Sequence, residues 1–207
     1  MKRRTVTIVI LLLMSVACSL PIAREAPERR EFVLDVSRSP GQKAGPSIGV
    51  LRVNEFRVPQ QYEGRGFKYR LDDLTFQSDF YNEFFTLPGQ MIAEQTRRWL
   101  ADSGIFKGVD GATEDLQSSY ILDGTIQELY GDYRFAEPRG VMAIDFVLLE
   151  DVKGRRKVVF NNSYKQEWPA SGRSAKELAR AWNDALFSIL QAFEKDLQAK
   201  LGRTSGS

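Results

Sequence analysis

The chain contains a single cysteine, Cys18, and its position points to one kind of chemistry. It follows the uncharged and mostly apolar segment 5–17, which itself follows three cations, Lys2, Arg3 and Arg4. A short basic segment, an apolar run and small residues before a cut are typical of an export signal. A cysteine placed at that cut predicts a bacterial lipoprotein, whose mature first residue is acylated, with palmitate among the fatty acids, and held in a membrane.

Two cuts are compatible with the residues that precede the cysteine. Ala17 and Cys18 fit the lipoprotein pattern Leu-(Ala or Ser)-(Gly or Ala)-Cys, with Ser15 in place of the leucine. Ser15-x-Ala17 also fits the small-x-small pattern of an ordinary secretory cut, which would leave Cys18 unmodified. An exported protein with an odd cysteine otherwise carries a reactive thiol or an intermolecular bridge, so we favour acylation. Ser19 is typical of lipoproteins sent on to the outer membrane.

Histidine is absent from the sequence, which removes the commonest general base and the commonest metal ligand. With Cys18 acylated, Ser-His and Cys-His nucleophile systems and zinc sites built from His or Cys are excluded. Paired carboxylates or a Ser-Lys arrangement remain. The carboxylate candidates are Asp72, Asp73 and Asp79, and then Asp110, Glu114 and Asp115. The second set lacks the calcium-loop spacing, and solvated loops are the simpler interpretation of both. We expect no enzyme activity, no catalytic residue, no metal and no cofactor.

The charge of the chain gives little reason to expect nucleic-acid binding. The formal net charge is +2, and removal of Lys2, Arg3 and Arg4 with the leader leaves a mature chain near −1. The remaining Lys and Arg residues are interspersed with Asp and Glu, so that no basic patch forms. Nucleic acid is therefore not an expected partner.

The sequence predicts a single mature domain preceded by a leader and a tether. The apolar run is shorter than the roughly 20 residues that span a bilayer, so removal of 1–17 is expected. Segment 18–30 holds two prolines and five charges without periodicity, as a tether would. Segment 31–201 forms the domain, and 202–207 is expected to be a disordered tail.

Hydrophobic periodicity predicts six strands and two helices. The strands are expected at 31–36, 47–53, 67–71, 120–133, 141–150 and 157–168. The helices are expected at 88–102, which Pro88 begins and Gly104 ends, and from Ser174, where Ser174 and Glu177 form a capping box. The second helix carries a broad apolar face: Leu178, Trp182, Ala185, Leu186, Ile189, Leu190, Phe193 and Leu197. The order predicts an α+β fold with a mixed or antiparallel sheet and two main helices packed on one face.

An aromatic cluster lies in segment 76–85, between the third predicted strand and the first predicted helix. Its members are Phe76, Phe80, Tyr81, Phe84 and Phe85. A spacing of four residues fits both a helix and a strand, and we expect an extended segment that runs into a helix. These side chains suit a lipid groove or a subunit contact, but core packing is the favoured interpretation.

Several short motifs together carry a resemblance to a known family. They are Cys18 to Pro21, Ile48 to Val53, Val58-Pro59, Tyr62, Arg65, Tyr69-Arg70, and the strand Tyr120 to Ile126. In this order, and with the terminal amphipathic helix, the chain resembles the ABC-type transport auxiliary lipoproteins, the group that includes paraquat-inducible lipoprotein C. The resemblance covers about residues 18–197.

The resemblance implies a non-enzymatic subunit of an MCE-type ABC phospholipid transport system. In such systems an MCE-domain protein carries lipid across the periplasm, and the auxiliary lipoprotein docks or receives that conduit at the outer membrane, as a homo-oligomeric ring. Acylated Cys18, which attaches the chain to the membrane, is the one site residue that the family supplies. The alternatives are an envelope-assembly lipoprotein, for example a lipopolysaccharide export accessory, a soluble periplasmic binding protein, or a periplasmic enzyme that uses carboxylates.

Overall fold

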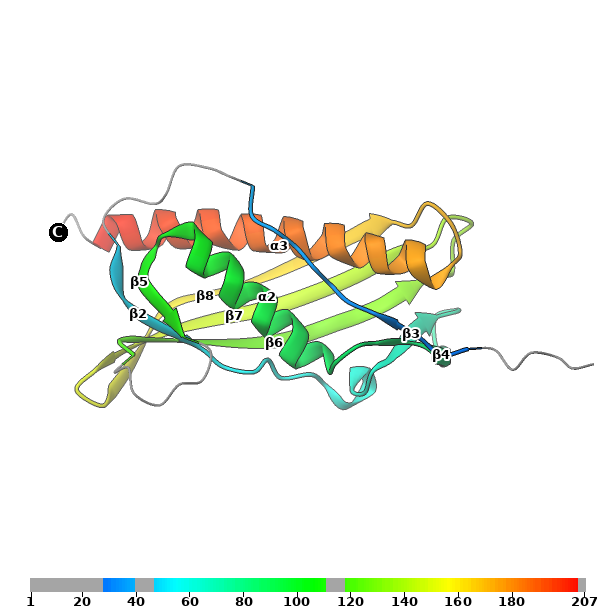
Figure 1. Ribbon diagram of the computed structural model, residues 1–207, viewed down its shortest axis with the longest axis horizontal. Helices are drawn as coiled ribbons and strands as arrows, with labels where there is room; N and C mark the ends of the chain where they lie inside the picture. The colour runs from blue at the N-terminus through cyan, green and yellow to red at the C-terminus, as the bar shows by residue number, and fades with distance from the viewer. Residues whose placement is uncertain (1–27, 40–46, 111–117, 205–207) are drawn as a thin grey trace, which may run out of the picture.

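The structure, a computed structural model, describes residues 28–39, 47–110 and 118–204. The strands are β1 (Arg30–Phe32), β2 (Ile48–Val53), β3 (Gly66–Arg70), β4 (Phe76–Phe84), β5 (Phe106–Asp110), β6 (Tyr120–Asp132), β7 (Arg139–Val152) and β8 (Arg155–Pro169). The helices are η1 (Gln60–Tyr62, 3₁₀), α2 (Pro88–Ser103) and α3 (Ala175–Thr204). The strands form one eight-stranded sheet, and α2 and α3 cover one of its faces (Figure 1). The predicted α+β architecture is confirmed.

The long strand β6 organises the sheet. On one side it begins an antiparallel meander with β7 and β8, as the turn-forming residues Pro138-Arg139-Gly140 and Lys153-Gly154 in their connections predict. On its other side two short strands share its length in parallel pairing, β2 along its first residues and β3 along its last two. Strand β5 extends the sheet beyond β2, while β4 and then β1 extend it beyond β3.

Helix α2 begins and ends at the residues that the sequence predicts. Pro88 occupies the first turn, where its missing N–H costs nothing, and the preceding Leu87 is extended. Gly104 ends the helix with φ 71°, a left-handed conformation that glycine adopts without strain. Met91, Ile92, Trp99 and Leu100 form the apolar stripe of the helix and are buried against the sheet and α3.

Helix α3 confirms the clearest sequence pattern. All eight residues of its predicted apolar face are fully buried. Ser174 accepts the Glu177 N–H at 3.2 Å, which is half of the expected capping box. The Glu177 carboxylate, expected to bond the Ser174 N–H, accepts hydrogen bonds from Ser171 and Arg180. The helix extends to Thr204, into the segment predicted as a tail.

Several predictions for the strands were wrong. Segment 76–85 forms strand β4 with no helical part, and β5 was missed because its five residues carry too little periodicity. The first strand ends at Phe32 instead of Val36. Beyond Phe32, Asp35 N–H bonds Asn183 Oδ1 at 2.8 Å and Val36 N–H bonds Gln95 Oε1 at 3.1 Å. Side chains of the helices therefore take the hydrogen bonds that a neighbouring strand would have supplied.

Among the described residues, none of the helices combines the length and the hydropathy that crossing a bilayer requires.

Candidate functional site

The residue to which the sequence assigns the firmest chemistry, Cys18, lies outside the described residues, as do Glu114 and Asp115. Asp110 ends the edge strand β5. The remaining candidates, Asp72, Asp73 and Asp79, lie on the hairpin formed by β3 and β4 and can be judged from their hydrogen bonds.

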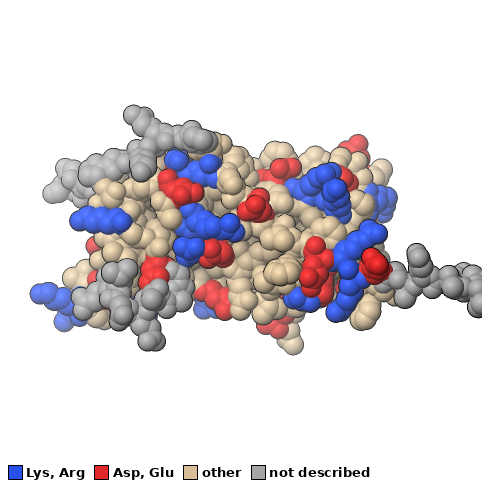
Figure 2. Space-filling model, viewed as in Figure 1, with Lys and Arg blue, Asp and Glu red and all other residues tan. Residues whose placement is uncertain are grey.

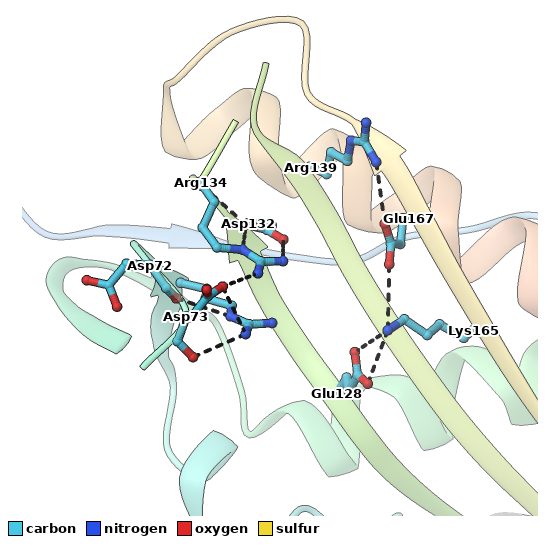
Figure 3. Close-up of polar contacts among 9 residues, drawn as sticks. Asp72, Asp73, Glu128, Asp132, Arg134, Arg139, Lys165 and Glu167 are labelled. Atoms are coloured by element: carbon cyan, nitrogen blue, oxygen red, sulfur yellow. Dashed lines mark hydrogen bonds and ion pairs between the residues drawn. The ribbon is translucent and has the colours of Figure 1, made fainter. Parts of the chain in front are cut away.

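Asp72 and Asp73 do not form an acid/base pair. Asp72 Oδ1 accepts the N–H groups of Leu74 and Thr75 at 2.9 and 2.8 Å, and these bonds hold its pKa below the ordinary value. It therefore closes the turn between the strands. Asp73 Oδ1 instead accepts a hydrogen bond from Arg134 at 2.8 Å (Figure 3). Both carboxylates serve the geometry of the hairpin.

Arg134 joins the hairpin to the centre of the sheet. Its Nε and Nη2 donate to the two oxygens of Asp132 at 2.9 and 2.7 Å, in a bidentate pair, while Nη1 reaches Asp73 (Figure 3). Asp132 is buried at the end of β6. Hydrogen bonds from Arg134, opposed by desolvation, lower the pKa of this carboxyl. The hairpin is thereby fixed to β6 by charge-assisted bonds as well as by strand pairing.

Substituting Asp132 with Asn is expected to lower the free energy of unfolding at neutral pH by about 1–3 kcal/mol. The folded pKa of Asp132 lies below the unfolded value of about 3.9, so its stabilisation is complete above that value and is lost as the pH falls from there through the lower folded pKa. Urea unfolding from pH 7 to pH 2 should show a D132N deficit that shrinks in acid. A deficit that stays constant with pH would contradict this account.

A second set of polar contacts lies on the open face, the sheet face opposite α2 and α3. Lys165 Nζ lies 2.9 Å from Glu128 and 3.6 Å from Glu167, and Glu167 lies 3.6 Å from Arg139 (Figure 3). These charges alternate in sign across β6, β7 and β8. Exposed pairs of this kind contribute about 0–1 kcal/mol each. The ammonium group of Lys165 lies between the carboxylates of Glu128 and Glu167, so these two acids do not form an acid/base pair. The row of charges keeps this face of the sheet hydrated.

The aromatic cluster corrects the expectation of core packing. Only Phe84 is buried, where it packs against Phe67 and Trp182. The other four are exposed to water, by 67% for Phe80, 56% for Phe85, 47% for Phe76 and 42% for Tyr81. Four exposed aromatics within ten residues are a dense apolar surface for one strand, and such surfaces mark contact sites.

Residues 79–82 form an ordered bulge on β4, which we call the aromatic knob. Gly66 pairs with Glu83 but Lys68 pairs with Ser78, so β4 carries extra residues between these two pairs. A side chain at Gly66 would lie 2.6 Å from the carbonyl oxygen of Asp79, so this close approach requires glycine. The extra residues carry Phe80 and Tyr81 outward, with their rings 5.3 Å apart in an edge-to-face contact.

Asp79 holds the knob in place. Its Oδ1 accepts the N–H groups of Tyr81 and Asn82 at 2.8 and 3.0 Å. Its Oδ2 accepts the hydroxyl of Tyr69 at 2.6 Å and the amide of Asn82 at 2.7 Å. Desolvation alone would raise the pKa of Asp79, but these hydrogen bonds outweigh it and lower the pKa. Burial and the Asp79 carboxylate together raise the pKa of Tyr69.

Arg29, from the start of the described chain, completes the knob. Its guanidinium lies 4.9 Å from the centre of the Phe80 ring, and its Nε donates to the Phe80 carbonyl at 3.3 Å. It also lies 3.6 Å from Glu83, which is buried and bonded by Arg65 at 2.6 Å. The carboxylates of Asp79 and Glu83 are thus hydrogen-bonded, and the exposed groups of the knob itself are the Phe80 and Tyr81 rings with the Arg29 guanidinium beside them.

The sequence held one signal for the knob that periodicity alone does not reveal. Asp79 and Asn82 flank two aromatics, and both residue types favour turns that bond the backbone two or three residues on. That signal argues for a break in β4 and for an outward position of Phe80 and Tyr81.

The surface hollows of the described chain offer no second candidate. One hollow, of about 390 Å³, lies between β8 and the end of α3 and is lined by one carboxylate, Asp196. That carboxylate accepts a hydrogen bond from the Tyr164 hydroxyl at 2.9 Å and one from Asn162 at 3.3 Å. No group of three or more Asp, Glu, His or Cys within the described ranges is arranged to hold a metal ion. On the face seen in Figure 2, Lys and Arg alternate with Asp and Glu.

Comparison with solved structures shows that the chain is similar in fold to known proteins. The crystal structure of protein XCC0632 from Xanthomonas campestris, of the family model DUF330, matches with a TM-score of 0.74 at 17% identity, over 86% of this chain and 100% of that chain. A crystal structure of an uncharacterized protein matches with a TM-score of 0.57 at 14% identity, over 75% and 96%. Lipoprotein GNA1162 from Neisseria meningitidis reaches a TM-score of 0.39 at 9% identity, over 77% and 99%, too low to carry an argument.

No protein-family model matches the chain, and no curated protein matches it. At these sequence identities the similarity to solved structures extends to the fold alone. The chain therefore shares the α+β fold of the Xanthomonas protein, with an open mixed sheet and two helices on one face.

Proposed function

We propose that this protein is a non-enzymatic, membrane-anchored lipoprotein that serves as a docking subunit of an MCE-type phospholipid transport system at the outer membrane. The observation that carries the proposal is the lone Cys18 directly after an export signal. The motif resemblance to the transport auxiliary lipoproteins and the fold likeness to a DUF330 protein support it.

The charged side chains of the described domain suit a binding role. The carboxylates of Asp72, Asp73, Asp79 and Asp132 each accept hydrogen bonds that fix a turn or a strand. A general acid or base must instead reach a substrate with a pKa near the working pH. The exposed aromatics of β4 resemble the anchors of contact surfaces, where aromatic residues and Arg are enriched.

Crosslinking in intact envelope membranes, followed by affinity capture and identification of partners, tests the proposal. We expect the wild-type chain to recover an MCE-domain protein. The Cys18→Ala variant, exported but not acylated, should leave the membrane fraction and lose most of that partner. Consistent recovery of a lipopolysaccharide export complex in place of an MCE protein would overturn the transport role. An unmodified mature chain by intact mass would overturn the anchor.

A further inference from the structure

We propose that the aromatic knob, residues 79–82 with Arg29 beside it, rests in the headgroup region of the phospholipid membrane that anchors the chain, so that the β3–β4 end of the domain faces the bilayer. The inference rests on the proposed acylation of Cys18. It adds an orientation and a second membrane contact, neither of which the anchor alone supplies.

The knob holds its aromatic rings exposed through a fixed set of hydrogen bonds. Four hydrogen bonds to Asp79 and one from Arg29 to the Phe80 carbonyl fix the bulge, although Phe80 remains 67% exposed. Burial is the ordinary position of a phenylalanine in a stable strand. An ordered turn that holds an apolar ring in water instead prepares that ring for contact with another phase or molecule.

The knob lies at the end of the domain from which the chain leads back to Cys18. The described chain enters at this end, where Arg30 pairs with Asn82 of the knob (Figure 1). The chain from Cys18 to Arg29 spans at most about 40 Å even when fully extended. An acylated Cys18 therefore keeps the knob near the bilayer, whereas the β7–β8 hairpin lies at the opposite end of the molecule (Figure 1).

The residue types of the knob suit a lipid headgroup region. Tyrosine and other amphipathic aromatics favour the membrane–water interface, and arginine near the surface is attracted to anionic headgroups. Two acidic residues close to the knob, Asp79 and Glu83, are bonded by Tyr69 and Arg65, which reduces their repulsion of phosphates. A third, Glu31, is 41% exposed and lies 3.3 Å from Arg65, which offsets its charge. Phe85 and Val33, 56% and 55% exposed, extend the apolar surface next to β1. Phe85 N–H is bonded to the Phe32 carbonyl at 2.8 Å, which keeps the two segments together.

A site-specific dye tests the orientation. Because acylation blocks Cys18, the single native cysteine, Phe80→Cys can be labelled selectively with nitrobenzoxadiazole. Val158→Cys is the matched control, since Val158 is 55% exposed and lies on β8, at the far hairpin (Figure 1). The acylated protein is reconstituted into vesicles of phosphatidylethanolamine and phosphatidylglycerol. We expect the dye at position 80 to become several-fold brighter and to be quenched by headgroup-labelled lipid, and the dye at 158 to emit as in water.

A dye at a second position tests whether the native side chains of the knob, and not the dye itself, make the membrane contact. With the label on Phe85→Cys, the double substitution Phe80→Ser and Tyr81→Ser should return the emission to that seen in water. Circular dichroism should stay unchanged because both side chains are exposed. Water-like emission from position 80 in a chain that intact mass and flotation show to be acylated and membrane-bound would overturn this inference and leave the proposed function standing. An unacylated chain that does not float would overturn the anchor, and the inference with it.

Discussion

Replacing Glu194 with Ala is expected to lower the free energy of unfolding by about 3 kcal/mol, because it leaves a largely buried arginine without its partner. Arg38 Nε and Nη2 donate to both oxygens of Glu194 at 2.8–3.1 Å, and the two side chains are only 13% and 10% exposed. Trp99 Nε1 donates to the same carboxylate at 2.8 Å. One acid thereby joins the segment after β1 to both helices.

Two variants calibrate this effect. Glu194→Gln keeps an acceptor for the indole of Trp99 but removes the charge, so it should lie between wild type and Glu194→Ala. Glu167→Ala removes an exposed acid whose ion pairs are 3.6 Å long, and it should change stability by less than about 0.5 kcal/mol. Urea unfolding midpoints at constant slope provide the measurement. Equal losses for Glu194→Ala and Glu167→Ala would show that the buried cluster contributes no more than a surface pair.

The Glu194 cluster also shows where sequence reasoning reaches its limit. Arg38 and Glu194 lie 156 residues apart, and nothing in the local sequence of either identifies the other. The burial of α3, in contrast, can be predicted from its own sequence. Apolar side chains at every third or fourth position form one face of a helix, and the stable arrangement buries that face. The eight predicted core residues of α3 are accordingly all buried. Local periodicity is readable, whereas pairing between distant segments is not.

The sheet shows the same division. Turn residues between long strands predict the antiparallel meander of β6, β7 and β8 because short connections leave few alternatives. Strands β2 and β3 both pair with the same edge of β6, and each pairing joins segments that are separated by loops. No short sequence pattern predicts such pairing. The knob is an intermediate case. The repeated spacing of four in Phe76, Phe80 and Phe84 was compatible with a buried face, but the bulge at Asp79 changes which side chains point inward.

Trp182→Ala is expected to cost about 3–5 kcal/mol, the largest effect of any single truncation proposed for this chain. The Trp182 side chain is fully buried, and its ring lies 4.8 Å from Phe67 and 5.3 Å from Phe84. Its Nε1 donates to the Tyr130 carbonyl at 3.1 Å, and it packs so closely over β7 that a Cβ at Gly140 would lie 3.0 Å from its ring. The ring therefore connects α3 to the hairpin strands and to the meander at once.

This double connection gives the prediction a spatial signature. Loss of the ring removes packing beneath β3 and β4, whose shared ladder is short and interrupted, whereas β6, β7 and β8 retain their long ladders. Hydrogen exchange in Trp182→Ala should therefore accelerate most at β3 and β4, and Trp182→Phe should restore most of the protection while still lacking the bond to Tyr130. Trp168→Ala, which truncates a partly exposed ring on β8, should cost less than about 1 kcal/mol. Uniform acceleration across all strands would contradict this account, because it would show that the β3–β4 hairpin does not open separately from the rest of the sheet. The aromatic knob on that hairpin would then be as rigid as the sheet itself.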